Sequence, residues 1–144
     1  MTSVSGSFSG NIRVQSAISI PGQPNHSISI AEVTGIQKSS DENWNNSRIT
    51  YWGITEFMGN AGTQRGYYSN DHGAVGHEFG TFEGKVSTIN GQLVVEGTWK
   101  ATNGTEKFHG LSANGTFTTR LTSPTEIEAT WQGVYQLAAT AQAG

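Results

Sequence analysis

An alternation with a period of two residues runs through Phe8-Ser9-Gly10-Asn11-Ile12-Arg13-Val14-Gln15-Ser16-Ala17-Ile18-Ser19-Ile20. The even positions are mainly apolar, and polar residues fill most of the odd positions. Side chains of a β-strand point alternately to its two faces, so the pattern predicts one long strand whose even face is buried. The turn-forming run Pro21-Gly22-Gln23-Pro24-Asn25 predicts the end of this strand.

Alternating segments continue along the rest of the chain. A second row of residues on one face starts at Ile28 and ends at Ile36. Polar loops are expected over residues 37–46 and 70–76, and the single Trp44 in the first loop is a candidate lid or plug. Further strands are predicted over residues 47–58, 63–69, 77–87, 93–101, 107–119 and 126–137.

Turn signals separate several of these strands. The Asn-Gly pairs at Asn90 and Asn103 predict turns, and the pair at Asn114 predicts a turn or a bulge within a strand. Residues 138–144 are expected to form a short tail, and a chain of 144 residues suits one domain. About eight strands with short links and no crossover helices predict an all-β fold, an antiparallel up-and-down β-barrel, with a Greek-key sandwich as the alternative.

Composition argues against several classes of function. The chain has 8 Lys and Arg against 11 Asp and Glu, a net charge of −3 and no basic cluster, so a nucleic-acid partner is not expected. It has no cysteine, which excludes disulfides, thiolate metal sites and a cysteine nucleophile. No apolar run approaches the ~20 residues of a membrane helix, and the N-terminus lacks a signal-peptide pattern, so we expect a cytoplasmic protein.

Motifs for cofactors and metals are also missing from the sequence. It contains no nucleotide-binding glycine loop, no hydrolase nucleophile elbow and no zinc-binding His-Glu-x-x-His. Adjacent His77 and Glu78 point to opposite faces of a strand, and Asp71-His72 has no third ligand at a suitable spacing. We therefore expect neither a metal nor a cofactor.

The C-terminal half carries a pattern of glycines and aromatic residues. It consists of Gly80-Thr81-Phe82-Glu83-Gly84, Glu96-Gly97-Thr98-Trp99 and Gly110-Leu111-Ser112-Ala113-Asn114-Gly115-Thr116-Phe117, followed by an alternating strand ending in Tyr135. Over residues 47–135 the chain resembles an uncharacterised bacterial family of small barrels of the allene-oxide-cyclase type, related to lipocalin-like barrels. The resemblance implies a barrel that binds a hydrophobic substrate and shapes its conformation. Its motifs are structural, so they argue for the fold and not for a reaction.

Glu32 is the first candidate for chemistry, because it continues the row of Ile28 and Ile30. If that row lines the cavity, Glu32 is an inward carboxylate whose pKa is raised by burial, and it is a candidate general acid or base. The alternative is a carboxylate at the barrel rim or one paired with an arginine.

Residues 47–58 have large apolar groups in both rows. If the odd row is inside, Tyr51 brings a phenol into the cavity; if the even row is inside, Glu56 joins Glu32 as a second interior carboxylate. We favour the odd row. Trp52 and Met58 then lie outside, and this aromatic and apolar surplus indicates a homodimer or a higher homo-oligomer.

The later strands supply candidate binding residues. Trp99, Trp131 and Tyr135 are predicted to point inward, either filling the core or stacking on a ligand, and small residues such as Gly133 leave room for their rings. The other candidates are the phenol of Tyr68, a semi-buried His109 as proton carrier, an inward Arg65 that binds a substrate carboxylate or enolate, and Glu78, which faces inward if Phe82 belongs to the core.

Three functions are compatible with these residues. The first is a cofactor-free enzyme that binds a small, mostly apolar metabolite in the barrel and catalyses cyclisation, isomerisation or a related proton-transfer rearrangement. Glu32 or His109, with the phenol of Tyr51 or Tyr68, would move the proton. The second is a lipocalin-type binding protein without catalysis, and the third is a structural protein with a filled barrel. A cavity with an interior titratable group would favour the enzyme.

Overall fold

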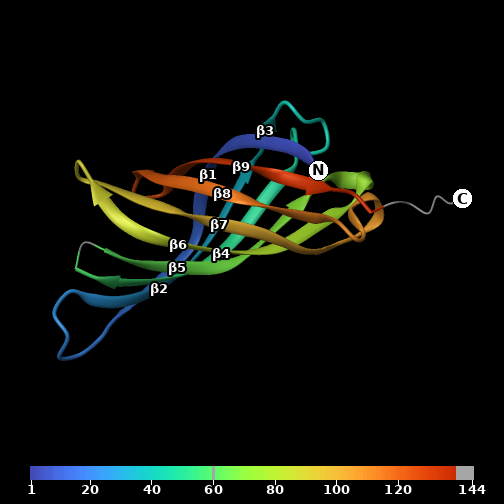
Figure 1. Cartoon of the computed structure of the whole chain (residues 1–144). Helices are drawn as coiled ribbons and strands as arrows, with labels where there is room; N and C mark the ends of the chain where they lie inside the picture. Colours follow the sequence, from blue (N-terminus) through green and yellow to red (C-terminus); the bar gives the residue numbers. More distant parts are fainter. Residues whose placement is uncertain (60, 139–144) are drawn as a thin grey trace, which may run out of the picture.

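The protein folds as a closed β-barrel (Figure 1). The computed structural model describes residues 1–59 and 61–138. Within these residues, eight antiparallel strands close the barrel and a ninth, β3, is a short addition. The strands are β1 (Thr2–Ser19), β2 (His26–Ile36), β3 (Lys38–Ser39), β4 (Arg48–Met58), β5 (Ala61–Asp71), β6 (His77–Ile89), β7 (Gln92–Gly104), β8 (Ser112–Ser123) and β9 (Glu126–Gln136). The predicted up-and-down barrel is confirmed, and the sandwich alternative is wrong.

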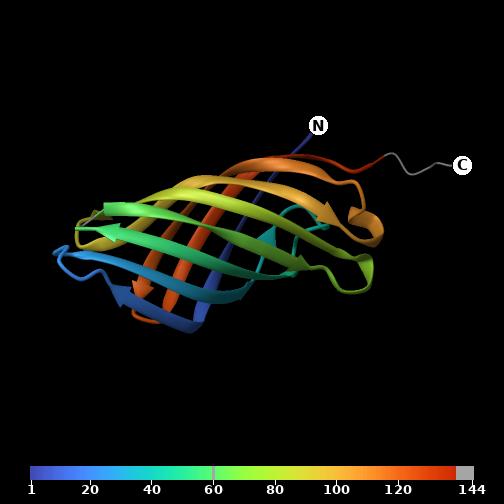
Figure 2. The same ribbon diagram turned by 90° about the horizontal axis from the view of Figure 1, so that it is seen from below.

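The long strand β1 closes the barrel because it pairs with two neighbours. Its residues Thr2 to Asn11 pair with β9, and Gly10 to Ser19 pair with β2. β3 continues the line of β2 alongside β1, where Ser39 is opposite Gly6. Figure 2 shows the strands running side by side around the wall. Closure pairs every barrel strand on both sides over part of its length, but among the described residues the stretch 13–19 of β1 pairs with β2 alone and keeps one open edge.

A β-bulge in β1 corrects the expectation of a single buried even face. The register with β2 shifts between Ile12 and Val14, so one extra residue is inserted there. An insertion of one residue moves all following side chains to the opposite face. Phe8 points inward as predicted, whereas Val14 and Ile18 are 57% and 69% exposed on the outside.

Of the three turns predicted at Asn-Gly pairs, the structure contains one. The Asn90-Gly91 turn is confirmed, with φ values of 52° and 78°. Asn103 ends β7 without turning, and Asn114 lies in regular register inside β8, so turns at these two positions are wrong. The segment before β8 is the 3-10 turn η2 (Glu106–Phe108), and η1 (Gly73–Val75) links β5 to β6. Of the predicted tail, residues 139–144 lie outside the described residues.

The interior is packed by aromatic rings lying over glycines of the adjacent strand or of the next strand beyond it. A Cβ atom on Gly133 would lie 2.7 Å from the ring of Trp99, and one on Gly80 would lie 2.5 Å from the ring of Tyr68. Real Cβ contacts are never so short, so these glycines make the ring positions possible. The predicted role of small residues between the tryptophans is therefore confirmed at Gly133.

Across residues 1–59 and 61–138, the structure contains no helix with the length and apolar character needed to cross a membrane.

Candidate functional site

Trp44 closes one end of the barrel. The loop after β3 turns on Asp41, whose carbonyl oxygen accepts hydrogen bonds from the backbone N–H groups of Trp44 and Asn45. The Asp41 carboxylate also accepts a hydrogen bond of 2.7 Å from the phenol of Tyr135. These contacts direct the Trp44 ring inward, where it is 2% exposed and lies 4.6 Å from the Tyr135 ring centre. The sequence left two roles open for Trp44, a lid or a plug, and its buried ring at the barrel end is that of a plug.

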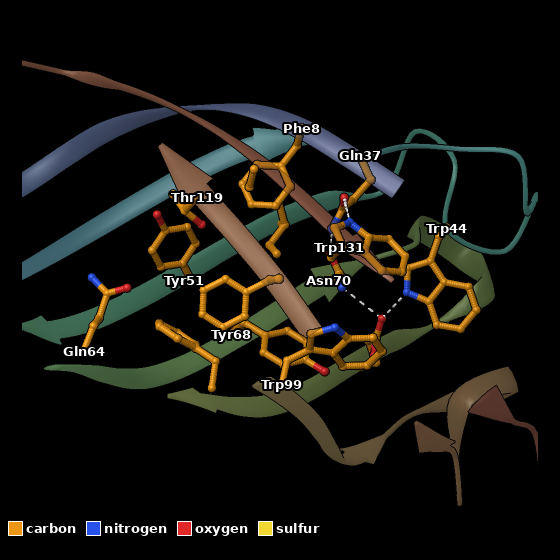
Figure 3. Close-up of a pocket in the computed structure, with 15 residues that line it drawn as sticks. Phe8, Gln37, Trp44, Tyr51, Gln64, Tyr68, Asn70, Trp99, Thr119 and Trp131 are labelled. Carbon is orange, nitrogen blue, oxygen red and sulfur yellow. Dashed lines mark hydrogen bonds between the residues drawn. The ribbon is translucent and has the colours of Figure 1, made fainter. Parts of the chain in front are cut away.

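A cavity lies in the barrel on the inner side of this plug (Figure 3). Its volume is about 70 Å³, counted as the space that the centre of a water molecule can reach. One water needs roughly 10–15 Å³ of such space, so the cavity corresponds to about five waters. Its walls are mostly aromatic, and the lining residues are Phe8, Gln37, Trp44, Ile49, Tyr51, Gln64, Tyr68, Asn70, Glu78, Phe82, Trp99, Phe117, Thr119, Ala129 and Trp131.

The polar end of the cavity is organised around Glu78, which is 1% exposed. Its Oε1 atom accepts hydrogen bonds from Trp44 Nε1 at 2.5 Å and from Asn70 Nδ2 at 2.9 Å. Asn70 Oδ1 in turn accepts from Gln37 Nε2, and Gln37 Oε1 accepts from Trp131 Nε1. Figure 3 shows this chain of side chains at one end of the pocket and Gln64 at the other. These hydrogen bonds hold the Glu78 carboxylate in place through its Oε1 atom alone.

The second carboxylate oxygen is left without a partner. Glu78 Oε2 and the phenolic oxygen of Tyr68 are both buried, and neither has a hydrogen-bond partner among the described residues. The ring of His72 is buried nearby, with Nε2 3.5 Å from Glu78 Oε1, and it stacks on Phe108. A buried polar atom normally has a partner, so the free oxygens of Glu78 and Tyr68 are the candidate polar contacts of the cavity.

Burial keeps the cavity phenols neutral. It raises the pKa of Tyr51, and burial together with the negative charge of Glu78 raises the pKa of Tyr68. Both phenols therefore stay protonated at neutral pH and can donate a hydrogen bond into the cavity. The effect of Glu78 on Tyr68 also places the two groups within electrostatic reach of each other.

Strand register explains why these residues meet. Asn70 is opposite Glu78, and Tyr68 is opposite Gly80, in the pairing of β5 with β6. Opposed residues of an antiparallel pair point to the same face, so Tyr68, Asn70 and Glu78 all enter the barrel. The prediction that Glu78 faces inward together with Phe82 is confirmed by the cavity lining.

Four of the predicted site residues line the cavity. These are Tyr51, Tyr68, Trp99 and Trp131. The favoured odd row of β4 is inside, since Ile49 and Thr55 are buried while Trp52 and Met58 are 39% and 63% exposed. Tyr135 is buried too, but it packs against the plug and is not part of the cavity wall.

Glu32, Glu56 and Arg65 lie on the outer face, so their candidate roles inside the cavity are wrong. For Glu32 the alternative of a carboxylate paired with an arginine is confirmed, since its Oε2 atom lies 3.7 Å from the guanidinium of Arg13. Glu56 is outside because the favoured odd row of β4 is inside. The β1 bulge aligns Glu32 with the exposed Val14, and Glu32 accepts a hydrogen bond of 2.8 Å from Trp52 Nε1. Glu56 contacts His26 at 2.6 Å, and Arg65 is exposed opposite Ile54. The apolar row that suggested an inner face for β2 is in fact on the outside.

His109 is not semi-buried in a strand as expected. It is exposed and follows the 3-10 turn η2, because the chain turns at Gly110 before β8 begins. The alternation used for the prediction therefore did not apply to this segment. Asn70 and Gln37 are the cavity residues that the sequence reasoning missed; a polar side chain on the row of Tyr68 is a signal that points to Asn70.

Comparison with known proteins does not assign the chain to a family. No family model matches the chain, and no curated protein is significantly similar to it. The resemblance to barrels of the allene-oxide-cyclase type therefore stays a prediction. In the described part of the chain, no group of three or more metal-binding side chains is present.

Proposed function

We propose that the barrel binds a small, largely apolar molecule about one or two rings in size, with one hydrogen-bond donor directed at Glu78. The observation that carries this proposal is the buried, unpartnered Oε2 atom of Glu78 in a cavity with aromatic walls. Leaving a buried polar group unpaired costs about 1–3 kcal/mol, and more for a charged one. A donor on the ligand removes this cost, so the site favours ligands that carry an N–H or O–H group.

Ring-shaped ligands suit the walls. Trp99 and Trp131 contact each other edge to face, with ring centres 5.8 Å apart, and Tyr68 meets Trp99 in the same manner. Such walls present flat faces and edges on which another ring can pack. The accessible volume of about 70 Å³ is about half that of an apolar cavity which holds one benzene molecule, so the rings of the wall move apart to admit a ring-shaped ligand.

Indole and indene test the proposed donor, because they have nearly the same shape and only indole has an N–H group. We expect the protein to bind indole roughly 10- to 100-fold more tightly than indene, since a hydrogen bond to a charged group contributes about 1.5–3 kcal/mol. Isothermal titration calorimetry measures both affinities. In Glu78→Gln the preference for indole shrinks to a few-fold, while the affinity for indene changes little.

Glu83→Gln is the matched control, because Glu83 is on the same strand but exposed to solvent. It leaves the preference for indole intact. Equal binding of indole and indene to the unaltered protein, or an unchanged preference in Glu78→Gln, would contradict the proposal.

A second candidate function is proton-transfer catalysis without a cofactor. It is favoured by the presence of two unpartnered groups in one cavity, the carboxylate of Glu78 and the phenol of Tyr68. In this reaction Glu78 removes a proton from a carbon next to a carbonyl, and the electrons of the C–H bond form an enolate. Tyr68 donates a hydrogen bond to the enolate oxygen. In a ketone whose deprotonated carbon adjoins a C=C bond, the electrons are shared along a dienolate, and Glu78 returns the proton to the far carbon of that bond while the C=C bond moves next to the carbonyl, which completes an isomerisation.

Exchange of the α-protons of 2-indanone in D₂O tests this chemistry on a ketone of indene size. We expect the protein to accelerate the exchange measured by NMR, and both Glu78→Gln and Tyr68→Phe to reduce the acceleration by at least about 100-fold. Tyr67→Phe, on the outer face, keeps it. If the α-protons of 2-indanone exchange no faster with the protein than in buffer, the proposal of catalysis is rejected and the binding proposal remains.

A further inference from the structure

One outer face of the barrel is apolar and exposed over four neighbouring strands. We call this surface the outer apolar face. It consists of Val14 (57% exposed), Ile18 (69%), Ile28 (42%), Ile30 (51%), Trp52 (39%), Ile54 (37%), Met58 (63%) and Tyr67 (63%). These residues come from β1, β2, β4 and β5.

The pairing of the strands makes the outer apolar face continuous. Ile18 is opposite Ile28, Ile30 is opposite Ile54, and Trp52 is opposite Tyr67. Opposed residues are in contact range on one face of a sheet, so these rows form one patch and not separate side chains. The bulge in β1 makes this continuity possible, because it turns Val14 and Ile18 to the same outer side of the sheet as Ile28 and Ile30 of β2.

The size of the patch is that of an interface. The exposed fractions correspond to on the order of 900 Å² of surface, whereas the largest apolar patch of a typical monomer is about 300–600 Å². A stable protein–protein interface buries about 800 Å² on each partner. The hairpin of β1 and β2 extends past the body of the barrel in Figure 1, and its residues 13–19 are exposed throughout, which flattens and lengthens this face.

The charges around the patch indicate which partner fits it. Arg65 is next to Ile54, Glu32 is next to Trp52, Glu56 is next to Ile28, and Arg13 is on the neighbouring part of β1. Both signs occur on the same face, so a two-fold rotation can bring opposite charges of two copies together. A nucleic acid or an anionic lipid surface would need a predominance of positive charge instead.

We propose that the chain forms a homodimer in which the outer apolar faces of two copies pack against each other. The strands β2, β4 and β5 are paired on both sides, so over these strands the copies meet sheet face to sheet face, as in a β-sandwich. Ile30 and Ile54 lie at the centre of the contact, and the arginines and glutamates lie at its rim. This proposal does not depend on the ligand cavity, because these side chains point away from the barrel interior.

Analytical ultracentrifugation of single variants tests the dimer. We expect the unaltered protein to be dimeric at about 10 µM, and Ile54→Glu to weaken the dimer by at least about 10-fold, because the new carboxylate faces Arg65 and burying such an ion pair is about 1–4 kcal/mol less favourable than the apolar contact it replaces. Ile89→Glu makes the same change at a side chain that is 50% exposed outside the outer apolar face, and it remains a dimer. A far-UV circular dichroism spectrum shows that each variant is folded.

A measurement on the unaltered protein keeps the proposal testable if Ile54→Glu does not fold. Trp52 is covered in the proposed dimer and exposed in the monomer. Acrylamide quenching of tryptophan fluorescence is therefore expected to decrease when the protein concentration is raised from one at which the dimer dissociates to one at which it forms. An unaltered protein that is monomeric at about 100 µM, or a dimer that a folded Ile54→Glu leaves intact, overturns the proposal.

Discussion

Replacing Trp44 with alanine is expected to lower the free energy of unfolding by about 3–5 kcal/mol, the range for a tryptophan removed from a core. Trp44 is 2% exposed, and its ring contacts Tyr135, Phe108 and Trp131 with centres 4.6, 5.8 and 6.4 Å apart. The substitution leaves an empty space at the end of the barrel. It also takes away the N–H donor that Glu78 accepts at 2.5 Å.

Urea denaturation measures this loss, and Trp44→Phe separates its two parts. Phenylalanine keeps a ring in the plug but has no N–H, so we expect a smaller loss of about 1–3 kcal/mol, the cost of one buried acceptor that loses its donor. If Trp44→Ala costs less than about 1 kcal/mol, the ring is not a plug that supports the barrel.

Gly133→Ala is expected to destabilise the protein by at least about 2–3 kcal/mol, because overpacking a filled interior forces neighbouring groups to move. The new Cβ would lie 2.1 Å from the backbone oxygen of Asn114 and 2.7 Å from the Trp99 ring. A backbone oxygen in a paired strand cannot retreat without breaking the pairing of β8 with β9. Trp99 is also a wall of the cavity, so indole affinity falls with stability.

Gly53→Ala is the matched control within the same barrel. Its Cβ would meet only the flexible amide of Gln64, at 3.2 Å, and Gly53 has no positive φ. We expect a change within about 1 kcal/mol, and a small gain if Gln64 moves aside, since alanine reduces the freedom of the unfolded chain. Equal losses from Gly53→Ala and Gly133→Ala in thermal unfolding would refute the close-approach argument.

The proposed ligand site and the proposed dimer depend on different residues. The ligand site needs a buried carboxylate with a free oxygen, which Glu78 supplies from β6. The dimer needs exposed apolar residues on adjacent strands, which β2 and β4 supply with Ile30 and Ile54. Failure of one proposal therefore leaves the other standing.

Periodicity predicted well wherever a strand is regular. In β7 and β9 the pattern of small and aromatic residues correctly placed Trp99 and Trp131 in the barrel. In β1 the same reasoning failed after Ile12, because one inserted residue reverses the face of everything that follows. Glu32 was a candidate for the interior for a related reason, because it continues an apolar row that faces outward; its alternative, a carboxylate paired with an arginine, is the one that the structure shows.

The sequence by itself determined the class of fold, since alternating strands joined by short polar links can bury their apolar faces only in an antiparallel sheet closed on itself or on another sheet. Only the tertiary structure decided where the chemistry lies. Glu78, Asn70, Trp44 and Gln37 come from separate segments, and the register of β5 with β6 and the inward turn of the loop at Asp41 bring them together. Contacts of this kind depend on distances between segments, which the local pattern of side chains does not contain.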